Sequence, residues 1–184
     1  MQINLSTLAV ILGLGMAVPQ IYGLMNPKGL AASVRKFPRS LPWGIALMLL
    51  GTGWFVYYLN AEPISDFAAY KPILLGGFGA VGVLSCIYVQ DFLAVRGMAV
   101  VMLLLAKLMV DTARWAETDW RLVIVTWACL FVAGGMWFTM YPWHMRDMLN
   151  WSTATEGRTR MLSGVRLAFG IFVAALGLTV FRSS

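Results

Sequence analysis

The chain has little charge, little cysteine and almost no histidine. Only 12% of its 184 residues are Asp, Glu, Lys or Arg, whereas 60% are hydrophobic. Ordinary globular domains carry about 25% charged residues, and a soluble domain of this size still needs a polar surface. The composition therefore excludes a soluble globular domain and predicts an integral membrane protein.

Reactive side chains are equally scarce. Cys86 and Cys129 lie within apolar runs, where a thiol behaves as a small hydrophobe, and their spacing fits neither a zinc site nor a disulfide framework. His144 is the one histidine. It is interpreted as a headgroup or water contact, and a single imidazole could also ligate chlorophyll. No Ser–His–Asp set, no pair of intramembrane carboxylates, no HExxH and no CxxC is evident. We expect no enzyme activity, no cofactor and no metal site.

Long apolar runs dominate what remains. A membrane-spanning helix needs about 20 mostly apolar residues, and six segments meet this length. The predicted fold is therefore all-α and polytopic, a single transmembrane domain over 1–184. The first span shows no basic n-region, so we interpret it as retained and not as a signal peptide. The six predicted spans are Leu5–Met25, Leu41–Leu59, Ile73–Phe92, Ala94–Thr112, Leu122–Tyr141 and Met161–Phe181.

The basic residues divide unequally between the two sides of this arrangement, and Lys107 is left inside a span. Arg96 is counted with the loop 90–97, and Arg166 lies near the start of the last span. By the positive-inside rule the richer side is cytoplasmic, so both termini are expected outside the cell in a bacterial inner membrane. Because the charge is sorted in short loops, we do not expect a nucleic-acid partner. The richer side holds Lys28, Arg35, Lys36, Arg39, Arg96, Arg146, Arg158, Arg160 and Arg166; the other holds Lys71, Arg114, Arg121 and Arg182.

Two cytoplasmic loops share a pattern. Each begins with a proline after a methionine, at Pro27 and at Pro142, and proline suits the first turn of a helix. Each then reads as a short amphipathic helix of the kind that lies in the membrane surface. Their polar residues are expected to contact anionic headgroups. These residues are Arg35 and Lys36 in the first loop, and His144 and Arg146 in the second.

The repeated loops suggest a chain built from helical hairpins, over 5–59, 73–112 and 122–181. The last unit, "MYP…MRDMLNW…GRTRMLSGVRLAFGIFVAALGLTVF", resembles the YjeT-like small inner-membrane proteins, which have two spans. The matching positions are Pro142, Arg146, Arg166 and Gly170, with Pro27, Lys28 and Gly44 as a looser first copy. The resemblance implies a helical hairpin architecture and no particular chemistry.

A second stretch, "AVPQIYGLMNPKGLAAS", is similar to the PQ-loop of SWEET-like transporters. Pro19 and Gln20 would be the hinge pair of that motif. PQ-loop proteins repeat this pair in a second unit, and here the fourth and fifth spans contain no Pro-Gln. The resemblance implies a small transporter.

Two charges lie clearly inside the fourth span, Lys107 and Asp111. They are four residues apart on one helix, so their side chains can meet. Ionisable residues inside a membrane are candidate functional residues. Three interpretations stay open: a structural ion pair at the outer interface, a contact to a partner, and an ion or proton relay.

Glycines recur in the spans. Small residues let helices approach closely in lipid, so we interpret them as packing positions, namely Gly44, Gly51, Gly76, Gly135, Gly164 and Gly170. The compact loops and the absence of catalytic residues favour an accessory or scaffold subunit of a larger membrane complex, with other membrane subunits as partners. The alternative is a small transporter or channel for ions or small solutes.

Overall fold

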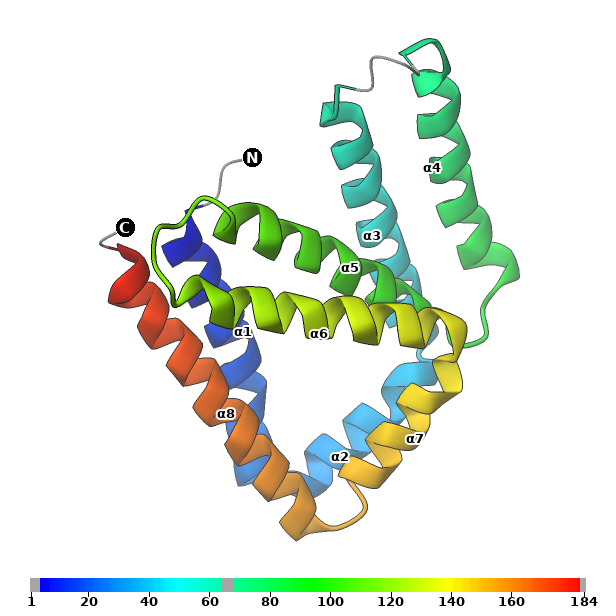
Figure 1. Ribbon diagram of the computed structural model, residues 1–184. Helices are drawn as coiled ribbons and strands as arrows, with labels where there is room; N and C mark the ends of the chain where they lie inside the picture. The colour runs from blue at the N-terminus through cyan, green and yellow to red at the C-terminus, as the bar shows by residue number, and fades with distance from the viewer. Residues whose placement is uncertain (1–3, 64–67, 183–184) are drawn as a thin grey trace. The chain divides into compact units, whose positions relative to one another are not determined.

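The computed structural model describes residues 4–63 and 68–182, and within these ranges it contains helices and no strands (Figure 1). Six of the helices are long and apolar enough to cross a membrane. This confirms the all-helical fold class and the six predicted spans of a multi-pass membrane protein. The six helices are α1 (Leu5–Met25), α3 (Leu41–Ala61), α4 (Lys71–Tyr88), α5 (Leu93–Ala113), α6 (Arg121–Met140) and α8 (Glu156–Leu178).

Two shorter helices lie between the long ones along the chain. α2 (Pro27–Lys36) follows α1, and α7 (Pro142–Ser152) follows α6, so each begins at its predicted proline. Short 3-10 helices complete the order: η1 (Phe37–Arg39), η2 (Ala68–Tyr70) and η3 (Val180–Arg182).

The largest differences between the helices and the predicted spans lie at the end of α4 and at the start of α8. The third span was predicted to reach Phe92, but α4 ends at Tyr88, and Phe92 adopts a φ of 53° before α5 begins. A bulky residue in this left-handed region interrupts a helix. α8 begins at Glu156, five residues before the predicted Met161, because the side chain of Thr155 accepts a hydrogen bond from the Arg158 N–H and caps the first turn.

The helices divide into two compact units. The first contains the described residues of Met1–Arg35, Ala106–Leu130 and Arg146–Ser184; the second contains those of Lys36–Leu105 and Phe131–Met145. α5 and α6 each contribute one part to each unit. The main helix pairs, α1 with α8 and α3 with α4, join helices of different predicted hairpins. The single domain over 1–184 and the hairpin units 5–59, 73–112 and 122–181 stay predictions.

In the first unit, α1 and α8 run side by side and antiparallel (Figure 1). Their backbones approach so closely that a Cβ atom added at Gly170 would lie 2.7 Å from the carbonyl oxygen of Gly13. The Ser6 hydroxyl donates a 2.6 Å hydrogen bond to the carbonyl oxygen of Gly177 across the same seam. Small residues therefore form the α1–α8 seam, as expected for helix association in lipid.

In the second unit, glycines allow similar contacts. Gly44 lies against Leu93 and the backbone of Ala94, and Gly51 lies against Val100, so both bring α3 onto α5. Phe55 of α3 meets Phe78 of α4 edge to face, with 4.9 Å between ring centroids.

The other glycines predicted to pack behave differently from one another. Gly135 of α6 lies against Leu103 of α5. Gly76 and Gly164 do not pack in this way: a Cβ atom at either position would meet nothing within 4 Å among the described residues. Gly76 is exposed and Gly164 is half-buried. Their role as packing positions stays a prediction.

Candidate functional site

The ion pair on α5 forms as the spacing predicts. Lys107 Nζ lies 2.8 Å from Asp111 Oδ2, and the two residues are one helical turn apart. Their side chains are 41% and 52% exposed, respectively. Since α5 ends at Ala113, Lys107 lies about 9 Å along the axis from that end at 1.5 Å per residue. The pair therefore occupies the outer surface of the last two turns of a long apolar helix.

The turn after α5 is closed by an arginine of the next helix. Arg121, the first residue of α6, donates from Nη1 to the carbonyl oxygen of Ala116 at 2.9 Å and to that of Arg114 at 3.4 Å. Arg114 itself lies over the Trp115 ring, with its guanidinium carbon 5.6 Å from the centroid. These contacts satisfy two carbonyl groups of the turn that follows α5.

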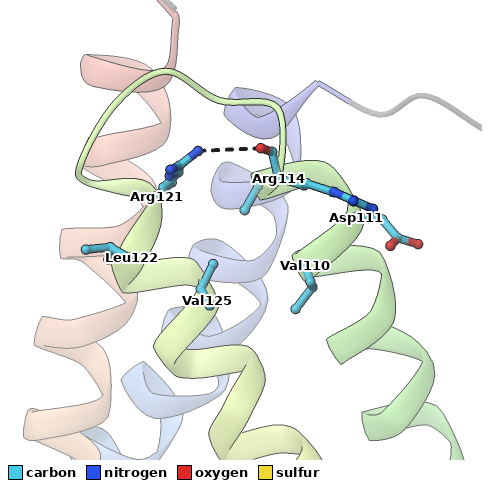
Figure 2. Close-up of a pocket in the computed structure, with 7 residues that line it drawn as sticks. Val110, Asp111, Arg114, Arg121, Leu122 and Val125 are labelled. Carbon is cyan, nitrogen blue, oxygen red and sulfur yellow. Dashed lines mark hydrogen bonds between the residues drawn. The ribbon is translucent and has the colours of Figure 1, made fainter.

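Asp111, Arg114 and Arg121 border an open pocket of about 420 Å³ at the α5–α6 turn (Figure 2). Figure 2 shows Asp111, Arg114 and Arg121 at the level of the turn, with the apolar side chains further along the two helices. The pocket therefore combines one acidic and two basic residues with apolar side chains. The complete lining is Val110, Asp111, Ala113, Arg114, Arg121, Leu122 and Val125.

Aromatic contacts hold this part of α6 against α8. Trp127 meets Phe169 edge to face, with 5.2 Å between centroids, and is only 7% exposed. Trp120 meets Phe172 in the same manner at 6.2 Å. Such aromatic pairs contribute about 0.5–1.5 kcal/mol each beyond their buried area. They therefore stabilise the part of α6 that lines the pocket.

The chemistry of the α5–α6 pocket suits binding through charged groups and apolar contacts. In the described part of the chain, no three His, Cys, Asp or Glu side chains are close enough together to hold a metal ion. The pocket itself contains carboxylate, guanidinium and aliphatic groups. A carboxylate and guanidinium groups beside aliphatic side chains can bind a partner's polar residues or a headgroup.

Two hydroxyl groups inside the spans bond to their own helices. Ser85 donates to the Val81 carbonyl at 2.7 Å, and Thr139 donates to the Gly135 carbonyl at 2.8 Å. A hydroxyl bonded to the carbonyl four residues earlier is satisfied without a neighbour. Neither hydroxyl needs water or a solute as a partner.

The Pro-Gln pair lies within a continuous helix. Pro19 is inside α1, which continues to Met25. Gln20 keeps its Oε1 atom buried with no hydrogen-bond donor among the described residues. The proline does not end the helix here.

The other predicted site residues are spread over α2 and α7. His144 lies among three aromatic rings, with centroids 5.8 Å from Trp137, 5.6 Å from Tyr141 and 5.9 Å from Trp143. Arg146 forms an ion pair with Asp147 at 2.8 Å. None of these residues lines the α5–α6 pocket.

On α2, Arg35 bonds to Thr153, and Lys36 is the last residue of the helix. Pro27, at the other end of α2, is buried. Sequence reasoning missed the Arg35–Thr153 contact, because 118 residues separate the two partners along the chain.

Sequence reasoning also missed the roles of Arg114 and Arg121. Both were counted only as loop charges, whereas they shape the turn beside Asp111. The available signal was the stretch "DTARWAETDWR", which places both arginines within one short connection.

Comparison with known proteins gives no relative for this arrangement: no family model matches the chain, and neither a curated protein nor a solved structure matches it significantly.

Proposed function

We propose that the chain is a non-catalytic integral membrane protein that acts as an accessory or scaffold subunit of a larger membrane complex. The observation that supports this most is the Lys107–Asp111 pair. It lies within a helix long and apolar enough to span, yet both side chains are about half exposed. Charged groups that face hydrocarbon are costly. A partner subunit that covers the pair would lower that cost.

The adjoining pocket supports the same role. Its wall combines Asp111, Arg114 and Arg121 with exposed apolar side chains, such as Leu122 at 61% exposure. Arginine and large apolar groups around a recess are typical of contact surfaces between proteins. We propose that other membrane subunits dock here, and that the resident membrane is a bacterial inner membrane.

A small transporter or channel is the alternative, and it has less support. Transport needs polar groups that line a path, as at the broken helices of known transporters. Ser85 and Thr139 instead satisfy their hydroxyls within their own helices. The repeat-like hairpins, Pro19 and the Lys107–Asp111 pair favour this alternative, and the double variant K107M/D111N would then abolish flux.

Site-specific photo-crosslinking tests the docking surface. A photoreactive amino acid replaces Leu122 in the pocket, and a matched control replaces Val165 on α8, which is equally exposed at 60%. We expect one discrete protein adduct from position 122 in native membranes and a weaker one or none from position 165. The adduct should decrease in K107M/D111N. Crosslinks to lipid alone from position 122 would contradict the proposal.

A further inference from the structure

A second cleft lies in the first unit, between α2 and the connection from α7 to α8. Both ends of α2 contact this region: one end contacts the first residue of α8, and the other contacts the connection itself. Near its start, Lys28 Nζ lies 3.2 Å from Glu156 Oε1. Near its end, Arg35 donates from Nε to Thr153 Oγ1 at 2.9 Å and from Nη2 to the Thr153 carbonyl at 2.6 Å. A cavity of about 290 Å³ lies between the two attachments.

Short side chains keep the cleft open. Ala31 and Ala32 form its floor on α2, and Ala154 lines the opposite side. The volume lies just below the range of about 300–1,000 Å³ that is usual for pockets of drug-sized ligands. The cleft therefore suits a small polar group more than an extended ligand.

Its charged groups are available to a ligand. The Lys28 and Glu156 side chains are 79% and 52% exposed, and an ion pair this exposed contributes little to stability. A ligand that carries both signs of charge can therefore replace it. Arg35 uses two of its five N–H donors on Thr153, so its guanidinium can still donate to an oxyanion.

The position of the cleft identifies the kind of ligand. α2 begins two residues after α1 ends at Met25, and Glu156 is the first residue of α8. The cleft thus lies at the ends of two long apolar helices, and the membrane placement proposed above would put it at the level of the lipid headgroups. A phosphate group would attract the side chains of Lys28 and Arg35. Because Lys28 would then leave its ion pair with Glu156, the Glu156 carboxylate would need another cation.

We propose that this cleft binds the headgroup of an aminophospholipid, with its phosphate on Lys28 and Arg35 and its primary ammonium on Glu156. The inference rests on the membrane placement proposed above and is independent of the subunit role. Choline headgroups have no N–H to donate to Glu156, and glycerol headgroups carry no positive charge. The Glu156 carboxylate therefore provides selectivity for ethanolamine over choline and glycerol headgroups. Lys28 and Arg35 provide affinity for the phosphate.

Titration of the full chain in detergent with short-chain phospholipids tests the proposal. Bound lipid is counted by native mass spectrometry for phosphatidylethanolamine, phosphatidylcholine and phosphatidylglycerol, and for free phosphorylethanolamine. We expect phosphatidylethanolamine to bind about tenfold more tightly than phosphatidylcholine, as a charge-assisted hydrogen bond allows. Equal binding of the three lipids would overturn the proposal. Tighter binding of free phosphorylethanolamine than of the lipid would overturn the proposal that the ligand is a lipid and would indicate a soluble phosphate ester.

Variants separate the two functions of the cleft. E156Q should remove the preference for ethanolamine over choline and keep binding to phosphate, whereas K28Q should weaken all three lipids. R160Q is the matched control, because Arg160 is an exposed residue of α8 outside the cleft. An E156Q protein that keeps the preference would overturn the assignment of Glu156. Since no partner is needed, discrimination by the chain alone supports this inference whether or not the subunit role holds.

Discussion

Among single residues, the Lys107–Asp111 pair follows directly from the sequence. Side chains on a helix tilt toward its N-terminus, so Asp111 leans back onto Lys107 one turn earlier, and the 2.8 Å contact results. The bonds of Arg121 to the Ala116 and Arg114 carbonyls could not be predicted in this way. They depend on the path of a seven-residue turn, which no periodic pattern determines.

The first prediction concerns this pair. K107M or D111N alone leaves one charge of the pair without its 2.8 Å partner, and each should lower the free energy of unfolding by roughly 0.3–1 kcal/mol, as for other half-exposed pairs one helical turn apart. The double variant K107M/D111N removes both charges and should lower it less than either single change. Thermal unfolding in matched detergent compares the four proteins. Additive losses in the double variant would show that the two groups are not coupled.

At the level of elements, helix starts were easier to predict than helix contacts. Pro27 and Pro142 each begin a short helix as expected, because proline fits the first turn. The seam between α1 and α8 was not predicted, although Gly170 was identified as a packing glycine. Lipid provides no hydrophobic driving force between helices. Which two helices pack together therefore depends on complementary faces of small residues, and a single sequence does not show which faces are complementary.

The second prediction tests that seam with two glycines of one helix. G170A would put a Cβ atom 2.7 Å from the Gly13 carbonyl oxygen and 3.0 Å from the Ala17 amide nitrogen, both backbone atoms. It should lower the free energy of unfolding by about 1–3 kcal/mol, the usual cost of overpacking. G164A meets nothing within 4 Å and should be neutral or stabilising by up to about 1 kcal/mol, since alanine favours helix.

Thermal unfolding of the two variants in the same detergent provides the measurement. The ratio of monomer to aggregate on gel filtration serves as the control for misfolding. If G164A destabilised the protein as much as G170A, the cost of G170A would not be specific to the close approach of α1 and α8, and the α1–α8 seam would lose its support.

For the whole molecule, composition was sufficient to predict a membrane protein with six apolar helices, because length and hydropathy alone define candidate spans. The division into two contact units was not predicted. Neighbouring segments in the sequence suggested hairpins, whereas α1 contacts α8 at the far end of the chain. The orientation of the protein follows from the charge distribution and remains a prediction that experiment can check.

The third prediction concerns that orientation. In a background with Cys86 and Cys129 replaced by alanine, single cysteines are placed at Glu117 in the α5–α6 turn and at Arg160 near the start of α8. A membrane-impermeant maleimide added to intact cells, or to spheroplasts where an outer membrane is present, should label E117C. It should label R160C only after permeabilisation, because basic segments stay in the cytoplasm. The reverse pattern would place both termini in the cytoplasm.

The central claim is that this protein works as a subunit, and the mass of its native particle tests that claim most directly. The tagged chain is extracted in native nanodiscs, and its mass and companions are measured by mass spectrometry. We predict a defined assembly larger than the 20.3 kDa chain, with stoichiometric membrane partners that are reduced in K107M/D111N. A lone monomer or a homo-oligomer of wild-type protein would contradict the claim and make flux through the Lys107–Asp111 pair the next measurement.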